Sequence, residues 1–316
     1  MFYEIEIIEE YIKSVYKALE FVDNKENVTV EIMWNLSSYF EECESEQKKT
    51  DIVVRIGELQ KKYGFQSLFY QDDKKPYTMA NYRRELNTRG VDYDFTIWGE
   101  SDCLMPSQTF VVLEQISEHA KANNIHRYIT TFAIRKMWDD SWKVLEHNKF
   151  TDAPFYEMVD PKATTEQSSI RYTMSQEEMD ELNDKVDELD VRMITHPKFD
   201  GSGLIISKDL LMTGANLPPA VYMNGDDSAF LQSCMLHMGQ NYKQFVVKNI
   251  LKVHNRNHPK KRRYVEGEDD SLNTHFKRAS KNWYKEFNNI SKGNLNKLYY
   301  NQDRFFNYKD FKKDDN

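Results

Sequence analysis

The sequence contains little cysteine and no long apolar stretch. Its three cysteines, Cys43, Cys103 and Cys234, are odd in number and far apart, which fits a reducing compartment better than a disulfide framework. No segment approaches the roughly 20 apolar residues of a membrane-spanning helix. The acidic N-terminal residues lack the basic and apolar regions of a secretion signal. We therefore expect a cytoplasmic protein without a membrane span.

Known phosphate-binding loop motifs are absent as well. No G-x-x-x-x-G-K-[ST] pattern occurs, which excludes a P-loop NTPase. Nucleotidyltransferases usually carry a glycine- and lysine-rich loop after their first strand, and Ile8-Glu9-Glu10-Tyr11 offers none. There is no internal repeat, and the formal net charge of -8 argues against indiscriminate attraction to nucleic acid or anionic membranes.

The chain does contain alternating strand-like and helix-like segments. Hydrophobic periodicity predicts strands over residues 3–7, 28–34, 65–70, 95–98, 126–134 and 204–207. It predicts helices over residues 12–22, 53–63, 78–89, 108–122, 179–189, 228–238 and 240–252. We expect the first strand, helix and strand to form a βαβ unit with a right-handed crossover. Repeated units of this kind predict an α/β fold, with a parallel or mixed sheet flanked by helices.

Two acids, Glu100 and Asp102, follow the apolar strand over residues 95–98. Ligands bind at the carboxyl ends of strands in open α/β sheets. In an extended chain, residues two apart point the same way, so both carboxylates can reach one divalent cation. A polar turn with a helix-capping acid is the simpler alternative for such a pair.

Three later patterns allow a structural and a functional interpretation. Asp226 and Asp227 follow a glycine at the start of a predicted helix, where an acid often serves as N-cap. Trp138 and its neighbour Asp139 suit a site that grips a polar ring, although packing in the core is the alternative for the tryptophan. From Lys252 to Tyr264 there are six basic residues and no acid, which suits phosphate binding.

The order of these features resembles a GT-A-type, family-2-like glycosyltransferase that uses a nucleotide sugar. The matching segments are the first-strand opening, Glu100-Ser101-Asp102 in the D-x-D place, the glycine loop at 201–203, Gly225-Asp226-Asp227 in the x-E-D place, and His254 as the C-terminal metal histidine. The chain departs from the family at Glu100, where the first acid of D-x-D is aspartate, and at Asp226, where x-E-D has glutamate.

The resemblance implies a GT-A-like, Rossmann-type sheet that is mixed and mostly parallel. It implies a catalytic domain over residues 1–264, with a nucleotide-binding half at 1–122 and an acceptor-binding half at 123–264. Residues 265–316 would form a polar, aromatic-containing, helical C-terminal extension.

The resemblance also implies roles for individual residues. A Mn²⁺ or Mg²⁺ ion would be held by Asp102, Glu100 and His254. The nucleotide sugar would be bound by Asp72, Asp73, Arg84, Asn87, Glu100, Lys260 and Arg262. The acceptor side would include Trp138 and Asp139. Asp227, or else Asp226, would be the general base of an inverting single displacement.

Several points stay open from the sequence. Arg83 and Arg84 are alternatively surface cations that pair with Glu85 or Asp92. The acceptor is a glycan, a protein or a modified nucleobase, and a homo-oligomer is possible. The alternatives to a glycosyltransferase are a nucleotidyltransferase that acts on a sugar phosphate, and a non-catalytic binding protein whose acids only cap helices.

Overall fold

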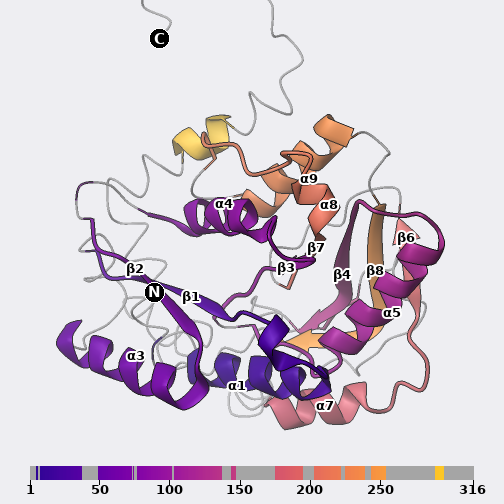
Figure 1. Cartoon of the computed structure of the whole chain (residues 1–316), viewed down its shortest axis with the longest axis horizontal. Helices are drawn as coiled ribbons and strands as arrows, with labels where there is room; N and C mark the ends of the chain where they lie inside the picture. Colours follow the sequence, from indigo (N-terminus) through magenta and orange to yellow (C-terminus); the bar gives the residue numbers. More distant parts are fainter. Residues whose placement is uncertain are drawn as a thin grey trace, which may run out of the picture.

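The computed structural model of the chain combines a mixed β-sheet with flanking helices (Figure 1). It describes residue 5 and residues 8–37, 49–72, 74, 77–101, 103–136, 144–146, 175–194, 203–221, 225–238, 243–253 and 289–294. In Figure 1, α4 (Met79–Gly90) and α9 (Asp226–Met238) lie above the central strands, and α1 (Ile8–Ala18) and α3 (Lys49–Tyr63) lie below them.

Besides a short helical segment near the C-terminus, three further helices and two short 3-10 turns complete the described helical segments. They are α5 (Thr109–Ala122), α7 (Gln176–Asn183), α8 (Lys208–Leu211) and the 3-10 turns η2 (Leu19–Phe21) and η3 (Lys25–Asn27). The strands are β1 (Glu31–Asn35), β2 (Gln66–Tyr70), β3 (Phe95–Ile97), β4 (Tyr128–Lys136), β5 (Val144–Glu146), β6 (Val191–Ile194), β7 (Ile205–Ser207) and β8 (Lys243–Val253).

The strands pair in two groups. β1 and β2 are parallel and are joined through α3, so they form a βαβ unit. The larger group has the order β3-β7-β4-β8-β6, with β5 paired to β4. Its longest pairing, β4 with β8, is parallel, whereas β7 lies antiparallel between β3 and β4. The predicted α/β class with a mixed sheet flanked by helices is therefore confirmed.

Local sequence signals placed most of these elements correctly. Thr78 and Asn81 form a reciprocal capping box at the start of α4, and Ser175 and Glu178 form another at the start of α7. Each box satisfies main-chain N–H groups that the first helical turn leaves without a partner. The Ser175 box is the one that the sequence predicted.

Three secondary-structure predictions are wrong in whole or in part. The helix predicted over residues 179–189 ends at Asn183. The segment over residues 240–252, predicted as a helix, forms the 11-residue strand β8. Nearly every residue of β8 is buried, because neighbouring strands and helices cover both of its faces. At the N-terminus, Ile5 lies in a helical turn just before α1, so the predicted opening strand is not found at the one described residue between 3 and 7.

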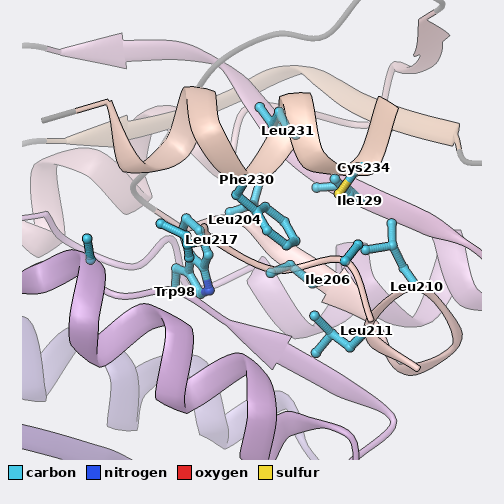
Figure 2. Close-up of a cluster of buried hydrophobic side chains, with 12 residues drawn as sticks. Trp98, Ile129, Leu204, Ile206, Leu210, Leu211, Leu217, Phe230, Leu231 and Cys234 are labelled. Carbon is cyan, nitrogen blue, oxygen red and sulfur yellow. The ribbon is translucent and has the colours of Figure 1, made fainter. Parts of the chain in front are cut away.

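The hydrophobic core is divided among the layers. One cluster packs α1 and α3 against β1, through Ile12, Ile32, Trp34, Ile52 and Ile56 among others. A second cluster lies between α4, α9 and the β3–β7 pair, and Figure 2 shows its members around Trp98 and Phe230. Complete burial of a large apolar side chain contributes roughly 1.5–3 kcal/mol, so these clusters fix the positions of the helices that carry the candidate site.

A short helical segment near the C-terminus contacts the loop at residues 216–221. Residues 289–294 are helical, and Ser291 is fully buried. The Asn294 side chain donates a hydrogen bond of 2.8 Å to the main-chain carbonyl of Ala220. Within the described ranges, no helix combines the length and the apolar character needed to cross a membrane.

Candidate functional site

Trp98, directly after β3, fixes the strand end on which the site is built. Its main-chain N–H donates to the Leu204 carbonyl at 2.9 Å, and the Gly203 N–H donates to the Trp98 carbonyl at 2.7 Å. The fully buried indole donates a hydrogen bond through Nε1 to Oδ1 of Asn87 at 2.8 Å. The centroids of the Trp98 and Phe230 rings are 5.0 Å apart. The chain that follows Trp98 therefore leaves the sheet at a fixed position between α4 and α9.

Arg83 of α4 joins two acids that are distant in sequence. One guanidinium nitrogen donates to Oδ2 of Asp226 at 2.5 Å, and the other donates to Oε1 of Glu100 at 2.8 Å. The Arg83 side chain is only 3% exposed, and its Cζ lies 4.6 Å from the centroid of the Trp98 ring. A single buried cation thus holds together the end of β3 and the start of α9.

The electrostatics of this triad keep Arg83 charged. Burial disfavours its charged form, but the negative charges of Asp226 and Glu100 outweigh burial, so the pKa of Arg83 is raised. Both carboxylates are largely buried, with side-chain exposures of 16% for Asp226 and 18% for Glu100. Arg83 thus pairs with two carboxylates at once.

Arg84 and Asn87 support the loop over residues 216–221. The guanidinium of Arg84 donates to the main-chain carbonyls of Leu217, Pro218 and Val221 at 2.9–3.0 Å. Asn87 donates to Oδ1 of Asn216 at 3.1 Å while it accepts from Trp98. The described contacts of these two predicted nucleotide-binding residues are therefore with the protein, and they position the chain that leads to α9.

The other described candidates are Asp72 and Asp227. Asp72 is exposed after β2, and its Oδ1 accepts from the N–H of Lys74 at 2.8 Å, as in an Asx turn. Asp227 lies in the first turn of α9, where its Oδ1 accepts from the N–H of Ser228 at 2.7 Å. Asp226 and Asp227 thus begin α9, as the sequence predicted.

Seven predicted site residues lie outside the described part of the chain. They are Asp73, Asp102, Trp138, Asp139, His254, Lys260 and Arg262. Among the residues that are described, no group of three or more histidine, cysteine or acidic side chains forms a metal site. Of the three predicted metal ligands, only Glu100 lies among the described residues.

A small cavity lies against the end of β3. Glu100, Tyr11 and Lys252 line it, together with the main chain around Gly99 and Gly203 and several apolar side chains. Burial raises the pKa of Tyr11, and Cys103 and Glu100 raise it further, so its hydroxyl is protonated at neutral pH. A Cβ atom at Gly99 would lie 1.9 Å from the Tyr11 hydroxyl, so this close approach requires glycine.

Tyr11 belongs to this region although the sequence did not single it out, and Arg83 and Lys252 belong to it although neither was chosen as a site residue by itself. For Arg83 a signal was present, because the buried face of α4 consists of Ala80, Arg83, Asn87 and Gly90 at helical spacing. This spacing directs Arg83 inward, so its interpretation as a surface cation is wrong. Lys252 was hidden within a segment that was predicted as a helix.

The comparisons with known proteins identify no family for this chain. No protein-family model matches it, and a search of curated proteins found no significant match.

Proposed function

We propose that the protein is a metal-dependent glycosyltransferase with a GT-A-like catalytic domain, which moves a sugar from a nucleotide sugar to an acceptor hydroxyl. One observation carries this proposal: Glu100 and Asp226 bind the same guanidinium of Arg83. These acids occupy the D-x-D and x-E-D places of the resemblance, which are the two places that must meet in such an active site.

The metal ion in this proposal is Mn²⁺ or Mg²⁺, held by Asp102, Glu100 and His254. Carboxylate oxygens and one imidazole suit these hard cations. The bound ion would neutralise charge on the donor diphosphate as it leaves.

The proposed roles of the protein's own residues follow from their places. Arg83 fixes Glu100 beside the cavity and fixes Asp226 at the start of α9. Because Asp226 is engaged by Arg83, we assign the general base to its neighbour Asp227. Asp227 would accept the proton of the acceptor hydroxyl while that oxygen attacks the anomeric carbon opposite the leaving diphosphate, with inversion of configuration.

The donor test is a calorimetric and thermal-shift panel of UDP-, GDP-, CMP- and TDP-sugars, each with and without Mn²⁺. Metal-dependent stabilisation by one nucleotide class is expected, and it amounts to about 2.7 kcal/mol when the free ligand is at 100 times its Kd. Asp102→Ala should abolish the metal dependence. Asp227→Asn should keep donor binding while it loses turnover, measured as release of the nucleoside diphosphate.

The panel also gives the result that would refute the proposal. If no nucleotide sugar stabilises the wild-type protein with any divalent metal, the protein is not a nucleotide-sugar-dependent transferase. The acids at 100, 226 and 227 would then serve only to hold β3 and α9 together in a non-catalytic binding protein.

A further inference from the structure

A cavity separate from the candidate site lies at the amino ends of the parallel strands β1 and β2. Its volume is about 390 Å³. Small-molecule sites in proteins commonly enclose roughly 300–1,000 Å³. The cavity shares no described lining residue with the small cavity beside Glu100, and Asp72, a predicted nucleotide ligand, follows the opposite end of β2. It therefore has room for a ligand of its own.

Two tyrosine rings form part of the wall of this cavity. Tyr16 comes from α1 and Tyr63 from the end of α3, and their ring centroids are 5.4 Å apart. The Tyr63 hydroxyl donates to Oε1 of Glu9 at 3.1 Å, which holds its ring in place. Burial raises the pKa of Tyr16, so its hydroxyl stays a hydrogen-bond donor at neutral pH. A tyrosine presents both an apolar ring and a polar end to a ligand.

The rest of the lining mixes charged, neutral polar and apolar side chains. Lys25 and Glu26 are neighbours in η3, and Gln66 begins β2. Adjacent charges of opposite sign give the cavity no overall preference for an anion or a cation. The Gln66 amide can both donate and accept hydrogen bonds, while Leu19 and Val28 supply apolar surface. The lining therefore matches an uncharged ligand that carries hydroxyl groups and an apolar face.

Hydrogen bonds fix the walls of the cavity. The Gln66 N–H donates to the Val30 carbonyl at 2.7 Å, where β2 meets the chain that leads into β1. The Asn24 side chain accepts from the N–H of Glu26 and so caps η3. Gly64 has φ +82, a conformation that favours glycine, and it leaves its part of the wall without a side chain. The cavity is thus preformed, which lowers the cost of binding.

We propose that this cavity binds a sugar ring. A sugar is uncharged and amphipathic, since its C–H groups pack on aromatic rings while its hydroxyl groups bond to polar side chains. Tyr16 and Tyr63 offer the aromatic surface, and Lys25, Glu26 and Gln66 offer donors and acceptors. The inference goes beyond the proposed function and does not depend on it, because it is drawn from the lining of this cavity alone.

Saturation-transfer NMR with glucose, galactose, mannose, N-acetylglucosamine, maltose and lactose tests the proposal. For a ligand of about 12 non-hydrogen atoms, a Kd on the order of 1 mM is expected. Gln66→Ala and Lys25→Ala each remove a hydrogen-bonding group from an exposed position, and each should weaken binding about 3- to 10-fold. The matched controls are Gln115→Ala and Lys13→Ala, which are exposed and outside the cavity and should bind as the wild type does.

A second readout locates the sugar in the wild-type protein. With ¹⁵N-labelled glycine, the sugar should shift the amide resonance of Gly64, which lines the cavity. It should leave unchanged the resonance of Gly57, on an exposed part of α3. Gly64→Asn and Gly57→Ala identify these resonances by their absence, since asparagine tolerates the positive φ at residue 64.

Three results would overturn the inference. They are a wild-type protein that binds none of the six sugars, a Gly64 resonance that no sugar shifts, and unchanged sugar affinity in both Gln66→Ala and Lys25→Ala. Adenosine is the contrasting probe. If adenosine shifts the Gly64 resonance and no sugar does, the two tyrosines select a planar ring, and the assignment to a sugar is wrong.

The outcomes separate this inference from the proposed function. If a free sugar shifts the Gly64 resonance but no nucleotide sugar stabilises the protein, the sugar site stands and the glycosyltransferase fails. If nucleotide sugars bind in a metal-dependent manner but no free sugar shifts this resonance, the glycosyltransferase stands and the sugar site fails.

Discussion

Removal of Arg83 is the most informative perturbation of the fold around the site. In Arg83→Met, Glu100 and Asp226 lose the cation that both of them bind, at 2.8 Å and 2.5 Å. Methionine keeps most of the packing against Trp98, so the loss is mainly electrostatic. The variant removes the guanidinium from between two largely buried carboxylates.

The expected cost is large for a single substitution. Removing one partner of a buried ion pair destabilises a protein by about 3–5 kcal/mol. Opposite charges 4 Å apart attract by about 4 kcal/mol at an effective dielectric constant of 20, which agrees with that range. Partial exposure of the two acids allows some rehydration, so we expect the lower end of the range, about 3 kcal/mol.

Urea unfolding, followed by circular dichroism and tryptophan fluorescence, measures this cost. The matched control is Arg89→Met on the same helix, since Arg89 pairs with Glu31 but its side chain is 41% exposed. An exposed pair contributes about 0–1 kcal/mol, so the control should change stability little. The triple variant Arg83→Met, Glu100→Gln, Asp226→Asn also removes the charges of both acids and should recover at least half of the loss.

Two results would refute the reasoning about the triad. The first is an Arg83→Met variant within about 1 kcal/mol of the wild type, because a buried cation between two acids must cost more to remove. The second is a triple variant as unstable as Arg83→Met alone. That result would place the loss in packing against Trp98 and not in the charges.

Two further predictions concern the surroundings of the site and the first helix. Gly99→Ala should lower the free energy of unfolding by about 1–3 kcal/mol, because the added Cβ would collide with the Tyr11 hydroxyl. The control is Gly57→Ala on an exposed part of α3, where no atom lies within 4 Å of the added Cβ. It should raise the free energy of unfolding by about 0.5–1 kcal/mol. Thermal unfolding measures both changes, and equal shifts in melting temperature would contradict the close contact between Gly99 and Tyr11. Tyr11→Phe removes the hydroxyl that the Cβ would meet, so it should partly restore the stability of Gly99→Ala. A hydrogen bond from Lys62 is the main reason that the pKa of Glu9 lies below its usual range. A hydrogen bond from Tyr63 and the positive charge of Arg55 further lower the pKa of Glu9. Its stabilising contribution is therefore present above about pH 4.3 and is lost as the pH falls through the lowered folded pKa, so Glu9→Gln should flatten acid unfolding curves. Glu58→Gln, which removes a 61% exposed carboxylate, is the control, and equal flattening in both variants would argue against a special role of Glu9.

The sequence predicted the elements whose signals are local. The helix over residues 78–89 and the strand over residues 65–70 were found within a residue or two of their observed bounds. The capping box at Ser175 and the acidic start of α9 were also found. Caps, turns and period-2 or period-3.6 patterns depend on neighbours a few residues away, so a single chain is enough to show them.

The sequence was misleading for β8. A strand covered on both faces has a nearly continuous apolar sequence, and periodicity does not separate such a strand from a buried helix. The error hid that Lys252 lies near the end of a strand, beside the cavity. Only the pairing of β8 with β4 and β6 shows which end of it reaches the site.

The sequence by itself therefore determined the α/β class, most helices, and the acids at 100, 226 and 227 as candidates. The tertiary structure decided how they meet. It placed Arg83, and not Arg84, between Glu100 and Asp226, and it assigned Arg84 to the loop at 216–221. The physical reason is that a buried charge is fixed by its partners. Here the partners of Arg83 lie on separate elements, which only the packing of α4, β3 and α9 brings together.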